Sequence, residues 1–171
     1  MHIYLTGFMG AGKSTVGRAL ARLLDRPFVD LDETIESAQG VTVTEIFEER
    51  GEMAFRQLES GVLRAVDDSH PAVVATGGGV VTVSQNVDWM KSRGATVWLD
   101  APFDMILQRM SAENLAGRPL FENATQARTL YESRRHEYGD SDIRIEVSSS
   151  HSAAEVAALI RDKLEERECA T

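Results

Sequence analysis

A glycine-rich segment near the start of the chain constrains its fold more than any other feature. It runs Gly7-Phe8-Met9-Gly10-Ala11-Gly12-Lys13-Ser14 and follows a short apolar run at residues 3–5. Apolar residues then recur at helical spacing, which predicts a helix that starts near Gly12 and ends before Pro27. A buried strand, a tight glycine turn and a helix in this order are typical of an α/β fold whose turn holds phosphate groups.

The alternation of strand and helix continues along the chain. Further apolar runs predict strands at residues 28–31, 73–75, 96–99 and 143–147. Helices are predicted at residues 42–49, 55–66, 84–93, 102–110 and 127–138, and from 153 onward. Alternating elements predict a parallel sheet with right-handed crossovers, and therefore a three-layer α/β fold. Ligands bind beyond the carboxyl ends of such strands, so we expect the site in the loops that follow the first three.

Local signals mark several helix ends. Thr42, with Glu45 three residues later, has the pattern of a capping box that opens a helix. Gly51 is expected to break that helix, and Ser84 is expected to cap the helix at residues 84–93.

Composition narrows the classes of partner. The chain has 171 residues, which fits a single domain with a sizeable core, and its net charge is −9. That charge argues against a broad surface for nucleic acid or anionic membrane, because such partners require a basic face. The single cysteine, Cys169, leaves no internal disulfide framework and suits a reducing compartment. No signal peptide or membrane span is apparent, and a cytoplasmic monomer is expected.

The glycine-rich segment matches G-x-x-x-x-G-K-[ST], a pattern that binds nucleotide phosphates. Its backbone N–H groups and the following helix N-terminus favour bound anions. Lys13 is expected to bridge the β- and γ-phosphates of ATP, and the Ser14 hydroxyl to ligate Mg²⁺. Thr15 adds a hydroxyl on the α-phosphate side, and Gly10, Ala11 and Gly12 supply the cradle. The alternative is a flexible turn with a solvated lysine, which the strand–turn–helix context disfavours.

Two carboxylates close the second predicted strand. Asp30 and Asp32 flank Leu31, so their side chains are expected on the same face of the strand. Two like charges this close repel unless a cation or a donor lies between them, and Mg²⁺ with a substrate hydroxyl would meet that need. We therefore assign Asp30 to the metal and Asp32 to the substrate. The alternative is that Asp30 is a loop residue and Asp32 caps the next helix.

A possible acceptor clamp lies further along. Arg56 and Glu59 are three residues apart on a predicted helix and can pair, which would present the guanidinium group to a second carboxylate. A surface ion pair is the alternative. Three consecutive glycines, residues 77–79, follow the third predicted strand, and a ligand that approaches their backbone would explain them. A flexible turn is the alternative.

The remaining candidates are arginines. Arg118 lies in a polar segment, residues 111–123, whose composition predicts a lid that closes over the transferring phosphate. Arg109, Arg134 and Arg135 lie on the predicted helices that flank this segment, and for each taken alone the favoured interpretation is a solvated surface residue.

Together these motifs resemble the shikimate kinase family over nearly the whole chain. The order is Gly-Phe-Met-Gly-Ala-Gly-Lys-Ser-Thr, Asp-Leu-Asp, Glu-Ile-Phe, Gly-Glu, Phe-Arg-x-x-Glu, Gly-Gly-Gly and Arg-Pro-Leu. The resemblance implies a nucleoside-monophosphate-kinase-like fold with a five-stranded parallel sheet and a lid. It also implies the phosphorylation of shikimate by ATP to shikimate 3-phosphate, a step toward chorismate and the aromatic amino acids.

The resemblance also implies roles for individual residues. Asp32 would hold the acceptor hydroxyl, and Arg56 and Arg134 would hold the shikimate carboxylate. Gly78 and Gly79 would donate backbone N–H groups, Arg118 would be the lid arginine, and Arg109 would lie along the adenine. Where the family has Arg-x-Pro-Leu-Tyr, this chain has Arg134-Arg135-His136-Glu137-Tyr138. The spacing to Tyr138 selects Arg134, and Arg135 is the alternative.

Two other functions remain open from the sequence. One is a different small-molecule kinase of the same fold, of the gluconate or nucleotide type. The other is a phosphate-loop module that binds nucleotide without catalysis. The pair Asp32 and Arg56 distinguishes a shikimate kinase from the first alternative, because the pair requires an acceptor with both a hydroxyl and a carboxylate.

Overall fold

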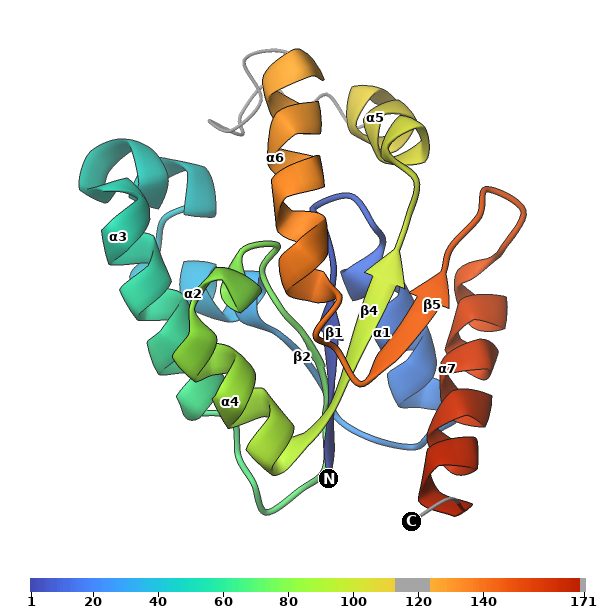
Figure 1. Ribbon diagram of the computed structural model, residues 1–171. Helices are drawn as coiled ribbons and strands as arrows, with labels where there is room; N and C mark the ends of the chain where they lie inside the picture. The colour runs from blue at the N-terminus through green and yellow to red at the C-terminus, as the bar shows by residue number, and fades with distance from the viewer. Residues whose placement is uncertain (113–123, 170–171) are drawn as a thin grey trace.

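The protein is a three-layer α/β sandwich, seen in a computed structural model that describes residues 1–112 and 124–169 (Figure 1). Its strands are β1 (His2–Thr6), β2 (Phe28–Asp30), β3 (Val73–Ala75), β4 (Gly94–Asp100) and β5 (Ile143–Glu146). Its α-helices are α1 (Lys13–Leu23), α2 (Leu31–Gln39), α3 (Val43–Arg64), α4 (Ser84–Arg93), α5 (Phe103–Ala112), α6 (Ala124–Tyr138) and α7 (Ala153–Cys169), and a 3-10 turn, η1, spans Val80–Thr82.

The five strands pair in the order β2-β3-β1-β4-β5, and every pair is parallel. Helices α1 and α7 pack side by side on one face, and α3, α4 and α6 lie on the other (Figure 1). The central strand β1 is buried along its whole length, as expected for a strand with helices on both faces. The predicted three-layer α/β fold with a five-stranded parallel sheet is therefore confirmed.

The segment between β2 and β3 forms a small unit of its own beside the sheet. Helices α2 and α3 enclose a separate apolar cluster of Ile35, Ile46 and Phe55. The capping box predicted at Thr42 is present, since the Thr42 hydroxyl accepts from Glu45 N and the Glu45 side chain accepts from Thr42 N. Gly51 interrupts α3 with φ 79°, a left-handed conformation that glycine adopts at low cost. The predicted break at Gly51 is confirmed.

Two local predictions were wrong. The second strand ends at Asp30, and Leu31 already begins α2, a helix that the sequence analysis missed. A helix that starts directly at the end of a three-residue strand leaves no loop to signal it. Ser84 is the first residue of α4 and not its cap, because Val83 occupies the cap position in an extended conformation.

No helix in residues 1–112 or 124–169 combines the length and the apolar character needed to cross a membrane.

Candidate functional site

The carboxyl ends of the strands border one large cleft of about 1100 Å³. It is lined by the glycine-rich turn after β1, by the carboxylates after β2, by the three glycines after β3, and by arginines from α3, α5 and α6. The structure therefore brings the described candidate residues together at one edge of the sheet. Of the residues proposed for the site, only Arg118 lies outside the described residues. The predicted lid, residues 111–123, also lies outside them, except for residues 111 and 112 at the end of α5.

The glycine-rich turn, residues 7–14, is called the phosphate turn below and has the geometry of an anion cradle. Gly7, Gly10 and Gly12 have φ values of 135°, 76° and 99°, which disfavour any residue with a side chain. At Gly7 a Cβ would also lie only 2.7 Å from the carbonyl oxygen of Leu99 on β4. Among the described residues no side chain caps the first turn of α1, so its N–H groups and its dipole face the cleft.

Lys13 lies along the inside of this turn. Its ammonium group donates to the carbonyl oxygens of Gly7 at 2.8 Å and of Phe8 at 3.0 Å, and the residue is only 9% exposed. Arg109 of α5 covers the turn from outside, where its Nη1 donates to Gly10 O and Ala11 O, each at 3.2 Å. Two cations therefore contact the loop that is expected to bind phosphates.

Asp30 joins the turn to the second strand. Its Oδ2 accepts from the Ser14 hydroxyl at 2.6 Å, and its Oδ1 accepts from the backbone N–H groups of Asp32 at 3.1 Å and Glu33 at 3.3 Å. Asp30 is thus the N-cap of α2. The helix cap that the sequence analysis considered for Asp32 belongs to Asp30, and Asp32 lies in the first turn of the helix.

Asp32 and Glu59 meet the backbone of Gly77. If Gly77 had a Cβ, that atom would lie 3.1 Å from the buried Oδ1 of Asp32 and 2.0 Å from the Oε1 of Glu59. Burial raises the pKa of the Glu59 carboxyl, the Arg56 guanidinium opposes that rise, and the negative charge of Asp32 adds to it. Two carboxylates therefore approach one glycine from α2 and α3.

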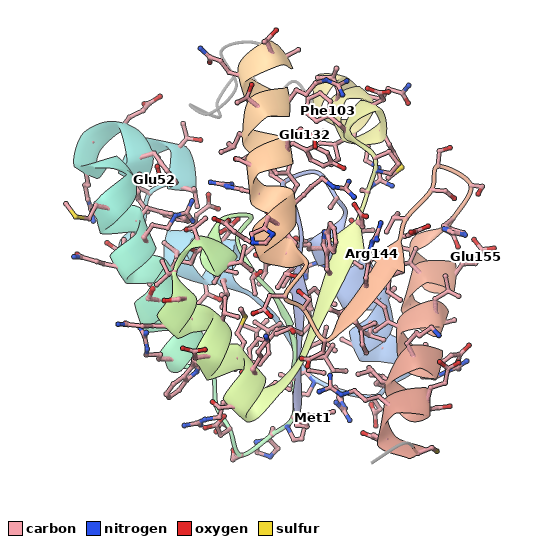
Figure 2. All side chains as sticks on the ribbon, viewed as in Figure 1. Met1, Glu52, Phe103, Glu132, Arg144 and Glu155 are labelled. Carbon is pink, nitrogen blue, oxygen red and sulfur yellow. The ribbon has the colours of Figure 1, made fainter. Side chains whose placement is uncertain are left out.

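Arg56 is held in place by two acids on its own helix. Its Nη1 lies 2.7 Å from Glu59 Oε2 and its Nη2 lies 3.1 Å from Glu52 Oε1. The predicted pairing of Arg56 with Glu59 is present, and because Glu59 is fully buried the pair is not an ordinary surface ion pair. Figure 2 shows Glu52 on the outer part of α3. The guanidinium group also packs over the rings of Phe47 and Phe55.

The three glycines are explained by these neighbours. A Cβ at Gly79 would lie 2.2 Å from Arg56 Nη2, and one at Gly78 would lie 3.1 Å from Met9 N. From the sequence we attributed the glycines to an approaching ligand. In the structure, side chains of the protein and the backbone of the phosphate turn already occupy the space that a Cβ would need. Their backbone still lines the cleft.

The two neighbouring arginines of α6, Arg134 and Arg135, have different contacts. Arg134 is 5% exposed, lines the cleft, and its Nη1 donates to Gly78 O at 3.4 Å. Tyr138, one turn later, also donates to Gly78 O. Arg135 instead pairs with Asp100 at 3.1 Å and donates to the Tyr131 hydroxyl at 2.7 Å. Of the two candidates, Arg134 is the one beside the triple glycine.

The far end of the cleft was not found from the sequence. It is lined by residues of the loop after β5 and the start of α7: Val147, His151, Ala153 and Val156. Their position at the carboxyl end of the last strand was the available signal, since the other residues of the cleft follow the same rule. Thr15 also lines the cleft, near its phosphate turn.

The comparisons with known proteins agree with this geometry. A family model described as "Shikimate kinase" matches residues 9–165. The shikimate kinase of Aquifex aeolicus is 41% identical over 146 residues, which cover 85% of this chain and 86% of that protein. The structure of shikimate kinase from Acinetobacter baumannii in complex with shikimate has a TM-score of 0.89 at 38% identity, covering 97% of this chain and 93% of the other.

More distant kinases share the fold alone. A gluconokinase from Sinorhizobium meliloti is 19% identical with a TM-score of 0.59, covering 97% of this chain and 96% of the other. That similarity supports the architecture and says nothing of the acceptor. The family match and the relatives near 40% identity confirm the resemblance drawn from the sequence motifs. The chain belongs to the shikimate kinase family.

Proposed function

We propose that this chain transfers the γ-phosphoryl group of ATP to the 3-hydroxyl of shikimate, giving ADP and shikimate 3-phosphate. The observation that carries the proposal is that Asp32, Arg56 and Arg134 line the same cleft as the glycine-rich turn. An acceptor with a hydroxyl at one end and a carboxylate at the other suits this arrangement. The shikimate named with the Acinetobacter baumannii structure is such a molecule, which supports the choice.

The nucleotide end is assigned to the turn after β1. Backbone N–H groups of residues 10–15 would cradle the phosphates, and Lys13 would exchange its contacts with the Gly7 and Phe8 carbonyls for the β- and γ-phosphate oxygens. Arg109 is placed beside the nucleotide by its contacts with Gly10 and Ala11. Charge stabilisation by these groups is expected to be the largest contribution to catalysis.

The donor set suits Mg²⁺. Ser14 Oγ and Asp30 Oδ2 are both oxygen donors and lie 2.6 Å apart. Within the described part of the chain, no group of three or more His, Cys, Asp or Glu residues could hold a metal ion. Mg²⁺ commonly takes one or two protein ligands and completes its shell with water and phosphate oxygens, which fits this pair. When bound, the ion would neutralise charge on the β- and γ-phosphates.

Asp32 is assigned to the acceptor hydroxyl. A carboxylate with a reference pKa of about 3.9 is a weak base toward an alcohol. It would therefore orient the hydroxyl by accepting its hydrogen bond and take the proton late in the transfer. The neighbouring Glu59 carboxyl is fully buried, and burial raises its pKa while the Arg56 guanidinium opposes that rise.

The substrate carboxylate is assigned to Arg56 and Arg134. Both guanidinium groups are fixed before the substrate arrives, Arg56 by Glu52 and Glu59, and Arg134 by Gly78 O. Planar, pre-oriented guanidinium groups bind carboxylates through two parallel hydrogen bonds. The two guanidinium groups would offer the carboxylate directed hydrogen bonds despite the net charge of −9 of the chain.

We further propose that residues 1–171 form one kinase domain, with an acceptor-binding region at about 32–62 and a lid at about 111–123 whose Arg118 closes on the transferring group. Closure would exclude water and so suppress hydrolysis of ATP. We expect the enzyme to be cytoplasmic and monomeric. Light scattering of the purified protein would check that it is a monomer.

The test is an ADP-release assay with ATP and Mg²⁺, run with shikimate, with gluconate and with no acceptor. Release that depends on shikimate, with the phosphate found on its 3-hydroxyl by NMR, is the expected result. ADP release that occurs with gluconate but not with shikimate would contradict the proposal and indicate a sugar-acid kinase. ATP binding without release under any condition would replace it by a non-catalytic nucleotide-binding module.

A further inference from the structure

A buried carboxylate at the end of β4 gathers two arginines from different elements. The Asp100 side chain is 6% exposed, and its Oδ2 accepts from Arg135 Nη2 of α6 at 3.1 Å. The same oxygen accepts from Arg144 of β5, through Nε at 2.9 Å and Nη2 at 2.6 Å. Both guanidinium groups pack over the ring of Trp98. Figure 2 shows Arg144 beside the end of the sheet.

Tyr131 extends this cluster toward the phosphate turn and α5. Its hydroxyl donates to Ala101 O at 3.0 Å and accepts from Arg135 Nη1 at 2.7 Å. Its ring meets Phe8 of the phosphate turn edge-on at 5.4 Å and lies 5.4 Å from Phe103, at the start of α5 (Figure 2). Helix α6 is therefore fastened to the end of β4 by Arg135 and Tyr131 together.

Other anchors of α6 lie at the triple glycine. Tyr131, Arg134, Arg135 and Tyr138 follow one another at intervals of three, one and three residues, so they form one stripe along the helix. Arg134 and Tyr138 contact Gly78 O, while Arg135 and Tyr131 contact the end of β4. Contacts at both places, including the pairing of Arg135 with Asp100, limit the rotation of the helix about its axis.

That rotation controls where Arg134 points. Side chains reach a radius of roughly 5–6 Å from a helix axis, so a rotation of about 10° moves such a group by about 1 Å. A displacement of this size is enough to misalign a two-point contact between a guanidinium group and a carboxylate, whose strength depends on geometry.

We propose that Arg135 is a positioning residue: clamped by Asp100 and Tyr131, it holds α6 in the rotation that aims Arg134 at the carboxylate of the acceptor. This inference rests on the proposed function, since it takes Arg134 as a substrate contact. It gives the second arginine of the Arg134-Arg135 pair a distinct role that requires no contact with substrate.

The cluster can be opened without leaving a buried charge alone. Arg135→Ala removes the ion pair of α6 with Asp100 and the hydrogen bond to the Tyr131 hydroxyl within α6. Asp100 keeps its hydrogen bonds from Arg144, so the fold is expected to survive. Tyr131→Phe removes only the hydroxyl and leaves the ring against Phe8 and Phe103. Arg144→Gln is the matched control, because it removes the other arginine from Asp100 and leaves α6 fastened.

The measurement is the KM for shikimate and for ATP in each full-length variant. We expect Arg135→Ala to raise the shikimate KM about five- to tenfold and Tyr131→Phe about two- to fivefold, as for residues that act through a neighbour. The ATP KM should stay within about twofold of wild type, and Arg135→Lys, which keeps the charge but not the two-point fork, should fall between wild type and Arg135→Ala. Arg144→Gln should leave both KM values unchanged.

A double-mutant cycle with Arg134→Ala separates positioning from a general loss of stability. If Arg135 acts through Arg134, adding Arg135→Ala to Arg134→Ala should raise the shikimate KM no further. An equal rise in both backgrounds, an equal rise for ATP, or no rise at all would overturn the inference. A wild-type shikimate KM in Arg134→Ala alone would instead overturn the proposed carboxylate clamp, so the two failures are distinguishable.

Discussion

Replacing Gly79 with alanine adds one methyl group where the guanidinium group of Arg56 already lies. The new Cβ would stand 2.2 Å from Arg56 Nη2, 2.4 Å from Cζ and 2.6 Å from Nη1. The backbone at Gly79 has φ −114° and ψ 7°, which alanine adopts without strain. The perturbation is therefore steric, and it is directed at one side chain.

The guanidinium group must move by about 1 Å or more to restore an ordinary contact distance of about 3.5 Å. It cannot do so freely, because Glu52 and Glu59 hold it and the Arg56 side chain is only 13% exposed. A misplaced charge-assisted hydrogen bond costs about 1.5–3 kcal/mol. Since about 1.4 kcal/mol is a factor of ten, we expect the shikimate KM to rise about ten- to hundredfold.

Steady-state kinetics with each substrate varied in turn would measure the effect. The ATP KM should change little, because the three atoms nearest to the added methyl group all belong to Arg56. Gly61→Ala is the matched control: the same change in an exposed part of α3, where a Cβ meets nothing within 4 Å. It should leave both KM values unchanged and stabilise the protein by about 0.5–1 kcal/mol. A folded Gly79→Ala enzyme with a normal shikimate KM would refute the assignment of Arg56 to the acceptor.

Three further predictions concern the phosphate turn, the acceptor hydroxyl and the fold. Lys13→Ala should lower kcat by about a hundredfold or more, since it removes a cation from the transferring phosphate; near-normal turnover would contradict the nucleotide assignment. Asp32→Asn should nearly abolish turnover while ATP binding, followed by calorimetry, is retained; loss of folding and of ATP binding together would make Asp32 a structural residue. Burial acts to raise the pKa of Asp142, but Arg167 and Thr96 hold it below its usual value, so its stabilisation is present above about pH 4 and lost as the pH falls below that. Urea unfolding should therefore show Asp142→Asn to be less stable than wild type by about 2 kcal/mol at pH 7, and this difference should shrink as the pH falls below about 4; a difference that does not change with pH would exclude an electrostatic origin.

The fold could be predicted largely because the phosphate turn and the strand–helix alternation are local signals. The positive φ values at Gly7, Gly10 and Gly12 are what the glycine pattern requires. The capping box at Thr42 and the break at Gly51 are likewise written in neighbouring residues. Helix α2 was missed because its cap, Asp30, is also the last residue of a strand, and the sequence cannot distinguish a carboxylate that caps from one that binds metal.

The site was harder to predict where it depends on packing between distant segments. The pairing of Arg56 with Glu59 follows from helical spacing. The contact of Arg135 with Tyr131, four residues earlier on α6, is local. Nothing local indicates that Asp100 pairs with both Arg135 and Arg144, because those contacts join β4 to α6 and to β5. The crowding of Gly77 and Gly79 by α3 side chains is equally a tertiary effect, and a run of glycines in a sequence does not say which side chain fills the space.

The two uses of Asp30 bear on how relatives of this chain should be interpreted. One of its oxygens caps α2 and the other meets Ser14, so any chain that keeps this architecture gains stability from an aspartate here, whether or not it still catalyses. Loss of such a cap costs about 1 kcal/mol, enough for selection on folding alone to retain it. An aspartate at this position is therefore a poor marker of catalysis in a diverged homologue. The side chain of Asp32 is not the helix cap. A homologue that has lost catalysis should therefore lose the aspartate at position 32 before the one at position 30.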